Sequence, residues 1–145
     1  MKVVVQKVKE ASVLVNDNIV GKINHGLLVF VGFTDGDSLK NIDFMVNKII
    51  NLRIFDDQNG VMNLSVKDVD GEILSVSQFT LYADALKGNR PSYIKALKSD
   101  DASKLYDIFN QRLEDLYKRP QKGIFQADMK VSLVNDGPTT IIIEK

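Results

Sequence analysis

The chain has 145 residues, of which 44% are apolar. This size fits one domain over residues 1–145, with a hydrophobic core large enough to be stable without cross-links. It contains no cysteine, which excludes disulfides, thiolate metal sites and cysteine nucleophiles and suits the reducing cytoplasm. Nineteen basic and nineteen acidic residues give zero formal net charge, which argues against a protein that binds a long polyanion by charge alone. No apolar run reaches the about 20 residues that span a bilayer, so we expect no membrane partner.

The first 33 residues are dominated by β-like patterns. Residues 3–5 open a strand, and residues 11–15 and 19–23 flank a turn-rich triplet, Asn16-Asp17-Asn18, that predicts a hairpin. The continuous apolar run at 27–31 predicts a strand buried on both faces.

Two amphipathic helices are predicted. Asp37 or Ser38 caps the first, whose apolar residues recur every three or four positions from 42 to 52, about four turns. The second spans 100–118, with acidic residues at its start, and Pro120 stops it.

The remaining segments complete a mostly β chain. We expect a hairpin between 53–55 and 61–66, a long strand over 71–82 and a last β pair at 125–134 and 139–144. Because helices and strands do not alternate regularly, a doubly wound sheet is disfavoured. The pattern predicts an α+β fold, mainly antiparallel, with two helices packed on a curved sheet or open barrel.

Common catalytic and metal-binding constellations are absent from the sequence. The single histidine, His25, is expected in a surface turn, and without another no Ser-His-Asp triad can form. Asp56-Asp57 is best interpreted as a solvated loop. There is no P-loop and no dinucleotide glycine pattern, so we expect neither a metal nor a cofactor.

The segment 83–99 carries a modest basic patch, Lys87-Gly88-Asn89-Arg90. Two interpretations stay open. It is either a solvated connection or a contact for phosphate, in which Gly88 lets backbone N–H groups approach.

Two polar stretches stand out. In the predicted strand, Ser77-Gln78-Phe79-Thr80 places Ser77 and Phe79 on one face and the other two on the opposite face. The second stretch, Asn135-Asp136-Gly137-Pro138-Thr139-Thr140, has the composition of a hairpin turn, yet Pro138 offers no N–H to a returning strand. A role other than strand reversal is therefore indicated.

Together the two stretches resemble the D-aminoacyl-tRNA deacylase family. The pair Ser-Gln-Phe-Thr and Asn-Asp-Gly-Pro-x-Thr is a specific signature, and this chain shows no departure at its key positions. The likeness runs nearly end to end and includes Ala11-Ser12-Val13, Gly26-Leu27-Leu28-Val29, Asn51-Leu52-Arg53-Ile54-Phe55, Met62-Asn63-Leu64-Ser65, Gly88-Asn89-Arg90-Pro91-Ser92 and Phe125-Gln126-Ala127-Asp128-Met129.

The resemblance implies an enzyme that hydrolyses the ester between a D-amino acid and the 3′ end of tRNA. It also implies a symmetric homodimer whose sites are completed by the partner chain, without metal or side-chain general base. Gly137-Pro138 would form a cis peptide inserted across the interface, where rigid main chain excludes the side chain of an L-amino acid. Glycyl-tRNA, which has no side chain to exclude, would be a side substrate.

The resemblance also assigns roles within the site. Ser77, Gln78, Phe79 and Thr80 would line one wall, with the Phe79 N–H as oxyanion donor and Thr80 as a positioning group, because no base is evident to activate it as a nucleophile. Met129 would lie near the terminal adenosine, whose 2′-hydroxyl would assist a water. The alternative is a non-catalytic module that binds an RNA end or a small ligand.

Overall fold

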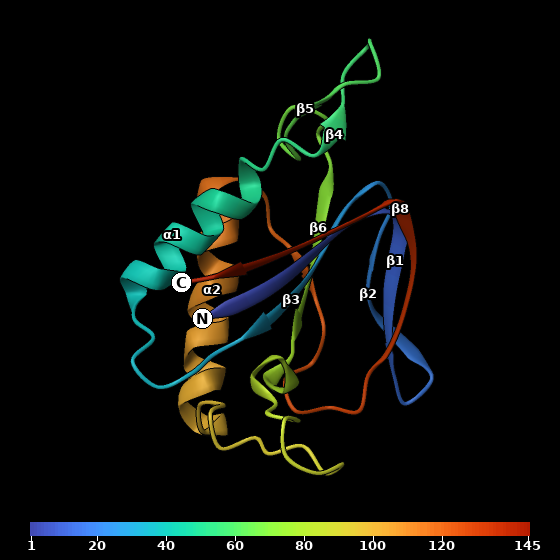
Figure 1. The fold of residues 1–145 in the computed structure, drawn as a ribbon. Helices are drawn as coiled ribbons and strands as arrows, with labels where there is room; N and C mark the ends of the chain where they lie inside the picture. Colours follow the sequence, from blue (N-terminus) through green and yellow to red (C-terminus); the bar gives the residue numbers. More distant parts are fainter.

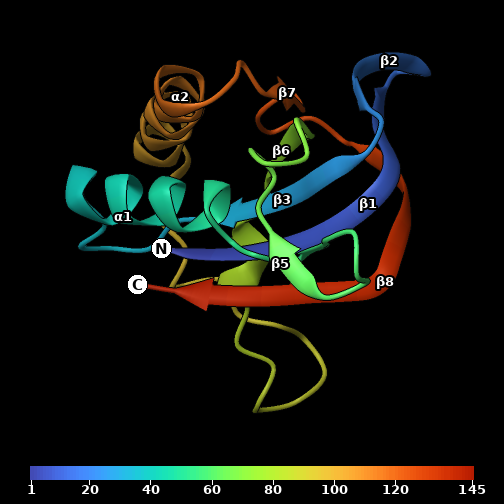
Figure 2. The same cartoon turned by 90° about the horizontal axis from the view of Figure 1, so that it is seen from above.

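A curved six-stranded sheet with two helices on one side forms the protein, whose computed structural model describes all residues, 1–145 (Figures 1 and 2). The sheet order is β2-β1-β3-β6-β7, and β8 pairs with the other edge of β1. The sheet strands are β1 (Lys2–Val15), β2 (Asn18–Ile23), β3 (Gly26–Gly32), β6 (Glu72–Ser77), β7 (Gln121–Lys122) and β8 (Lys130–Glu144). The other elements are α1 (Leu39–Ile50), the short pair β4 (Phe55–Asp56) and β5 (Met62–Leu64), the 3-10 helix η1 (Phe79–Tyr82) and α2 (Ser99–Leu116).

The strand β1 is the centre of the sheet. Its first half pairs antiparallel with β3, its second half with β2, and nearly its whole length with β8. The segments 3–5 and 11–15 are therefore one strand, because the residues between them also pair, as Lys7 does with Leu27. The predicted hairpin from β1 into β2 is confirmed, and register shifts along β1 accompany the bend visible in Figure 2.

The two helices cover one side of the sheet. The five buried residues of α1 fall on the predicted stripe, and with Phe109 and Leu113 of α2 they join a core of 20 buried residues that includes side chains from β1 and β3. Burial of an apolar stripe holds each helix, because isolated helices of this length are marginal in water. The predicted α+β fold, a mostly antiparallel curved sheet with two helices, is confirmed. Neither helix is long and apolar enough to cross a membrane.

A second, smaller core lies inside the curl of the sheet. It consists of seven buried residues from β1, β2, β3 and β6, with Met129, Val131 and Leu133 packed against it. The inner surface of the curl therefore has its own apolar filling, and the pocket described below adjoins it.

The predicted strand over 71–82 is wrong beyond Ser77. β6 ends there, the Gln78 N–H makes one more ladder-like bond to the Val31 carbonyl at 2.7 Å, and the chain then turns into η1. Tight bonds from Leu81 to Gln78 and from Ala83 to Thr80 replace the ladder. The alternation of faces predicted for residues 77–80 consequently fails.

The predicted last β pair is also wrong, because the chain does not reverse at Gly137-Pro138. Residues 125–129 are not a strand, and β8 continues through the motif, pairing with β1 on both sides of it. Asn135 lies opposite Val8 and Thr140 opposite Gln6, so residues 136–139 bulge out opposite one residue of β1. In both halves of β8, half-buried and exposed side chains alternate in register with β1. One strand is therefore found where two were predicted.

The β4–β5 hairpin is confirmed, although its strands are shorter than predicted. Asp57 orders its loop by accepting hydrogen bonds from the N–H groups of Asn59 and Val61 at 2.9 and 3.1 Å. The β4–β5 hairpin projects from the top of the molecule in Figure 1, whereas the loop after η1 lies at the bottom. The two chain termini lie side by side, since Lys2 pairs with Glu144.

Candidate functional site

A pocket of about 590 Å³ opens at the end of β6, between η1, the start of α2 and the segment leading into β8. Twelve of its 17 lining residues are hydrophobic. The lining residues are Val31, Gly32, Phe33, Val76, Ser77, Gln78, Phe79, Tyr93, Ala96, Leu97, Ser99, Ala102, Phe125, Gln126, Ala127, Met129 and Val131. Its size and mostly apolar lining, with a few polar groups, are those of a small-molecule or cofactor site.

Parallel pairing of β3 with β6 places the first wall. Ser77 lies opposite Val31, and the chain then passes so close to β3 that a Cβ on Gly32 would sit 2.9 Å from the Gln78 carbonyl oxygen. Glycine at position 32 therefore allows the turn into η1. That turn leaves the side chain of Phe79 57% exposed at the pocket rim.

Within this wall, the side-chain amide of Gln78 donates a short hydrogen bond to the Thr80 hydroxyl. Ser77, Gln78 and Phe79 line the pocket, whereas Thr80 does not. Thr80 therefore contacts the pocket through Gln78, whose orientation it holds. No Asp, Glu, His, Lys or Arg side chain lines the pocket.

Buried hydroxyl groups stand behind the wall. The Tyr106 hydroxyl of α2 donates to the Ser75 carbonyl at 2.8 Å, and burial raises the pKa of Tyr106. Burial, followed by the nearby Asp37 and Glu144 carboxylates, raises the pKa of Tyr82 at the end of η1 to about 12. Both phenols stay neutral at physiological pH and act as structural groups.

The opposite wall contains Met129. A Cβ on Gly123 would lie 2.5 Å from the Met129 sulfur, so glycine there makes room for the thioether. The Gly123 N–H donates to the Ser75 carbonyl at 2.9 Å and ties this segment to β6. A soft, half-buried sulfur at the pocket suits the face of a flat ring.

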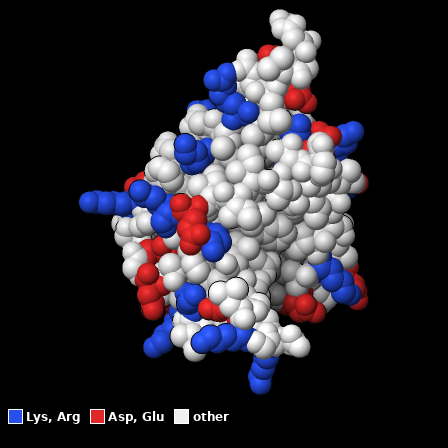
Figure 3. All heavy atoms as spheres, in the orientation of Figure 1, with Lys and Arg blue, Asp and Glu red and all other residues white.

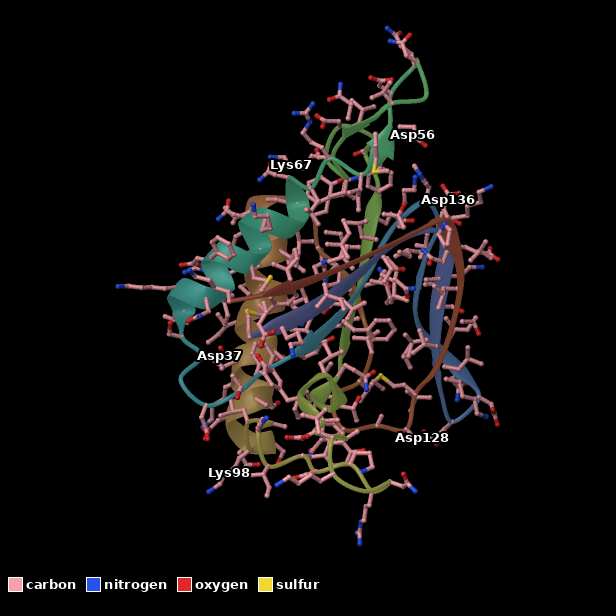
Figure 4. The ribbon with its side chains drawn as sticks, in the orientation of Figure 1. Asp37, Asp56, Lys67, Lys98, Asp128 and Asp136 are labelled. Carbon is pink, nitrogen blue, oxygen red and sulfur yellow. The ribbon has the colours of Figure 1, made fainter.

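Gly137 and Pro138 do not line the pocket of their own chain. They are exposed in the β8 bulge, and the peptide between them is cis, as the resemblance implied. Figure 4 places the neighbouring Asp136 well apart from Asp128, which is next to Met129. The chain thus brings Ser77, Gln78, Phe79 and Met129 together and leaves the Gly-Pro motif apart.

The amide of Asn135 fastens the bulge. It donates to the carbonyls of Lys7 and Thr139, both at 2.9 Å, while its oxygen accepts from Gln6 at 3.3 Å and Thr140 at 3.1 Å. All the hydrogen-bonding capacity of this side chain is used, so the exposed Gly137-Pro138 segment projects from a fixed base.

Lys7 beneath the bulge is a feature that the sequence reasoning missed. Its side chain is 4% exposed and lies 3.6 Å from the Asp56 carboxylate and 4.0 Å from that of Asp136. The sequence contained a sign of this buried lysine. Alternate residues of a strand face the same side, so Lys7 faces the core together with Val3 and Val5. A lysine at an inward strand position requires carboxylate partners.

The remaining candidates lie outside the pocket. His25 is exposed and packs edge-on against Phe55 at 5.1 Å, which confirms the predicted surface position. The chain has no group of three or more His, Asp or Glu side chains that could hold a metal ion.

Comparison with known proteins shows the family of the chain. Residues 4–144 match the family described as D-Tyr-tRNA(Tyr) deacylase. The chain belongs to this family. The resemblance stated from the two motifs is therefore confirmed.

Relatives of this deacylase family cover the chain from end to end. It is 60% identical over 145 residues to a D-aminoacyl-tRNA deacylase of Flavobacterium psychrophilum, covering 99% of this chain and 97% of that protein. A solved structure of a c-Myc DNA unwinding element binding protein superposes with a TM-score of 0.95 at 41% identity, covering 100% and 99% of the two chains. A probable eukaryotic D-amino acid tRNA deacylase, at 20% identity and a TM-score of 0.82 over 98% and 97%, shows the same fold.

Proposed function

We propose that this protein is a hydrolase that cleaves the ester of D-aminoacyl-tRNA, releasing the free D-amino acid and tRNA, with residues 1–145 as one deacylase domain. The observation that carries the proposal is the pocket walled by Ser77, Gln78 and Phe79 in a chain that deacylases match over its whole length. Membership of the family supports a carboxylic ester hydrolase of this type. The function would be chiral proofreading, a quality control of translation.

The proposed chemistry uses main-chain donors and the substrate itself. Phe79 begins η1, and the first N–H groups of a helix have no acceptor within it, so its N–H is free to stabilise the oxyanion of the attacked ester. One such donor contributes about 2.7–4 kcal/mol to lowering the barrier. Because no carboxylate or imidazole lines the pocket, the 2′-hydroxyl of the terminal adenosine would assist the attacking water.

The other groups of the pocket would position the substrate. Gln78, held by Thr80, would orient the ester or the terminal ribose, and Met129 would contact the adenine. The hydroxyl of Ser77 supplies a further polar contact at the end of β6.

Selection against L-amino acids would come from a second copy of the chain. Gly137 and Pro138 are exposed, lie in a bulge fixed by Asn135 and do not line their own pocket, so in a homodimer they could enter the pocket of the partner. Their main chain would occupy the place of an L side chain, whereas a D side chain would point out of the pocket. Glycyl-tRNA would escape this exclusion and be cleaved as well.

The surface of β8 supports the proposed homodimer. This strand has a neighbour, β1, on one edge only, and Val134 and Ile142 on it are 47% and 67% exposed. An unpaired edge with apolar side chains favours pairing with another chain. The partners would thus be a second copy and the 3′ end of aminoacyl-tRNA, in the cytoplasm that a cysteine-free chain suits.

The test is hydrolysis of D-tyrosyl-tRNA, L-tyrosyl-tRNA and glycyl-tRNA by the purified protein, followed as released amino acid. We expect release from the D and glycyl substrates, sparing of the L form, and no change on adding a chelator. Equal cleavage of both tyrosyl enantiomers would contradict the proposed selection.

The alternative is a binding module without catalysis, which the absence of an ionisable base from the pocket favours. Under that alternative, D-aminoacyl-tRNA would bind and remain charged over the same incubation. Measuring binding and release on one sample separates the two.

A further inference from the structure

The segment 83–98, here called the rim loop, connects η1 to α2 and is held in a defined shape at its base. Asp84 and Ser92 exchange two backbone hydrogen bonds of 2.8 and 2.9 Å. The Asp84 carboxylate accepts from the Leu86 N–H at 3.1 Å and pairs with Lys95 at 3.1 Å, and these contacts lower its pKa. The Asp84 carboxylate is therefore ionised at neutral pH, as its pairing with Lys95 requires.

The far end of the rim loop is fastened to the pocket. The Leu97 N–H donates to the Phe33 carbonyl at 2.9 Å, and the Thr34 hydroxyl donates to the Lys95 carbonyl at 2.6 Å. Tyr93, Ala96 and Leu97 line the pocket. These contacts make the loop part of the pocket rim, which disfavours its interpretation as a mere solvated connection.

The rim loop concentrates positive charge in a chain of zero net charge. It holds four basic residues, Lys87, Arg90, Lys95 and Lys98, and one acidic residue, Asp84, which Lys95 already neutralises. Lys87, Arg90 and Lys98 are exposed and have no carboxylate partner within 4.0 Å. Lys and Arg side chains gather along the lower edge of the face in Figure 3, where Figure 1 places this loop, and Figure 4 labels Lys98 there.

Two exposed aromatic rings line the pocket, one from η1 and one from the rim loop just after the Asp84–Ser92 bridge. Phe79 and Tyr93 are 57% and 42% exposed, both line the pocket, and their rings meet edge to face with centroids 5.1 Å apart. Exposed aromatic rings beside a cationic groove are the usual surface for single-stranded nucleic acid. Gly88 at the tip has φ +68°, and nothing lies within 4 Å of the place of a Cβ, so a ligand can approach its backbone.

We propose that the rim loop binds the single-stranded 3′ end of the tRNA just before its terminal adenosine. Lys87 and Arg90 contact the phosphates, and the ring of Tyr93 supports the adjoining base. This inference rests on the proposed function, because that function places the terminal adenosine in the pocket. Two contacts at the tip suit a chain without net charge, which holds the end of an RNA rather than its body.

The test compares two substrates that share the ester but differ in RNA length: D-tyrosyl-tRNA and the D-tyrosyl ester of adenosine. For the double variant Lys87→Ala/Arg90→Ala, we expect kcat/KM on the tRNA to fall about tenfold, mainly through KM. On the short ester it should change by less than about twofold, because that ester has no phosphate to bind.

Salt dependence supplies a second measurement. Loss of two phosphate contacts on a single strand should make the slope of log kcat/KM against log salt less steep by about 1.4 for the tRNA. The matched control is Lys67→Ala/Arg119→Ala, which removes one exposed lysine and one exposed arginine outside the rim loop and the pocket. Figure 4 places Lys67 far from Lys98 of the rim loop. This control variant should therefore leave kcat/KM unchanged on both substrates.

Direct binding decides the inference even if no hydrolysis occurs. A short fluorescent RNA ending in CCA should bind the wild type more tightly than Lys87→Ala/Arg90→Ala, and Tyr93→Ala should weaken binding without changing the salt slope. Equal RNA binding by the wild type and the double variant, or equal losses on both ester substrates, would overturn the inference. If the wild type cleaved neither D-tyrosyl-tRNA nor the D-tyrosyl ester of adenosine, the proposed function would be overturned instead.

Discussion

At the scale of single residues, the site depends on a contact between two polar side chains that share one wall. Gln78 faces the pocket, and Thr80, one residue beyond Phe79, accepts the hydrogen bond of its amide. The turn into η1 makes this contact, since in a strand both side chains would simply have pointed to the same face without meeting. We therefore propose that Thr80 acts through Gln78, as a positioning residue.

A threonine that only positions Gln78 should not be essential. We expect Thr80→Val to lower kcat/KM by about tenfold, the effect of losing one hydrogen bond of about 1.4 kcal/mol, and Thr80→Ser to retain most activity. Intact-mass measurement during turnover should show no acyl-enzyme. Complete loss of activity in Thr80→Val, together with an acyl adduct trapped on Thr80 of the wild type, would instead make Thr80 the nucleophile.

At the scale of elements, the β8 bulge and the β3–β6 pair place the two parts of the proposed site. The bulge presents Gly137 and Pro138 from a base fixed by Asn135, while parallel pairing with β3 carries Ser77 to the pocket. Neither part could be positioned by its own local sequence, because each depends on a strand remote in the chain.

Replacing Asn135 should loosen the bulge. Asn135→Ala leaves the Lys7 and Thr139 carbonyls without their donor, so we expect a loss of about 1–3 kcal/mol in the free energy of unfolding. The rate ratio between D- and L-tyrosyl-tRNA should fall as well. Asn47→Ala serves as control, because that amide makes one exposed contact within α1, to the Asp43 carbonyl. An unaltered enantiomer ratio in a destabilised Asn135→Ala would show that the bulge does not select.

The close approach of β3 to β6 predicts a sharp effect at Gly26. A Cβ at this position would lie 1.9 Å from the Glu72 carbonyl oxygen, so Gly26→Ala must separate the two strands. We expect a cost of about 3 kcal/mol or more in urea unfolding, with activity lost as Ser77 moves. Gly21→Ala, whose nearest contacts are at 3.0 Å, should cost clearly less, and equal costs would contradict this account.

At the scale of the whole molecule, the Gly-Pro motif does not line the pocket of its own chain, and its neighbour Asp136 lies well apart from Asp128, which adjoins the pocket residue Met129 (Figure 4). In the proposed dimer, each site combines the Ser77–Phe79 wall of one chain with Gly137-Pro138 of the other. A twofold axis would then give two identical composite sites, because the same surface serves both chains.

Mixing two defective variants tests this sharing. One carries Gln78→Ala in the pocket wall, and the other carries Asn135→Ala/Pro138→Ala in the bulge. If the site is shared, random heterodimers rebuild one intact site each, so about a quarter of sites should regain both rate and D selectivity after subunit exchange. If the mixture shows only the average of the two variants, the site belongs to a single chain.

The two helices and the family membership could be predicted from the amino-acid sequence alone. Spacing by three or four residues indicated the buried face of α1, and residue identity alone carried the family signature. Such features are local, so they need only a short stretch of chain to be read.

The ends of the strands and the contacts between remote segments became evident only in the three-dimensional fold. It merged 130–134 and 140–144 into β8, ended β6 at Ser77, and brought Met129 to the same pocket while leaving Gly137 and Pro138 outside. The physical reason is that strand pairing is non-local: alternation shows which face of a strand is buried, and the partner strand decides its length and register.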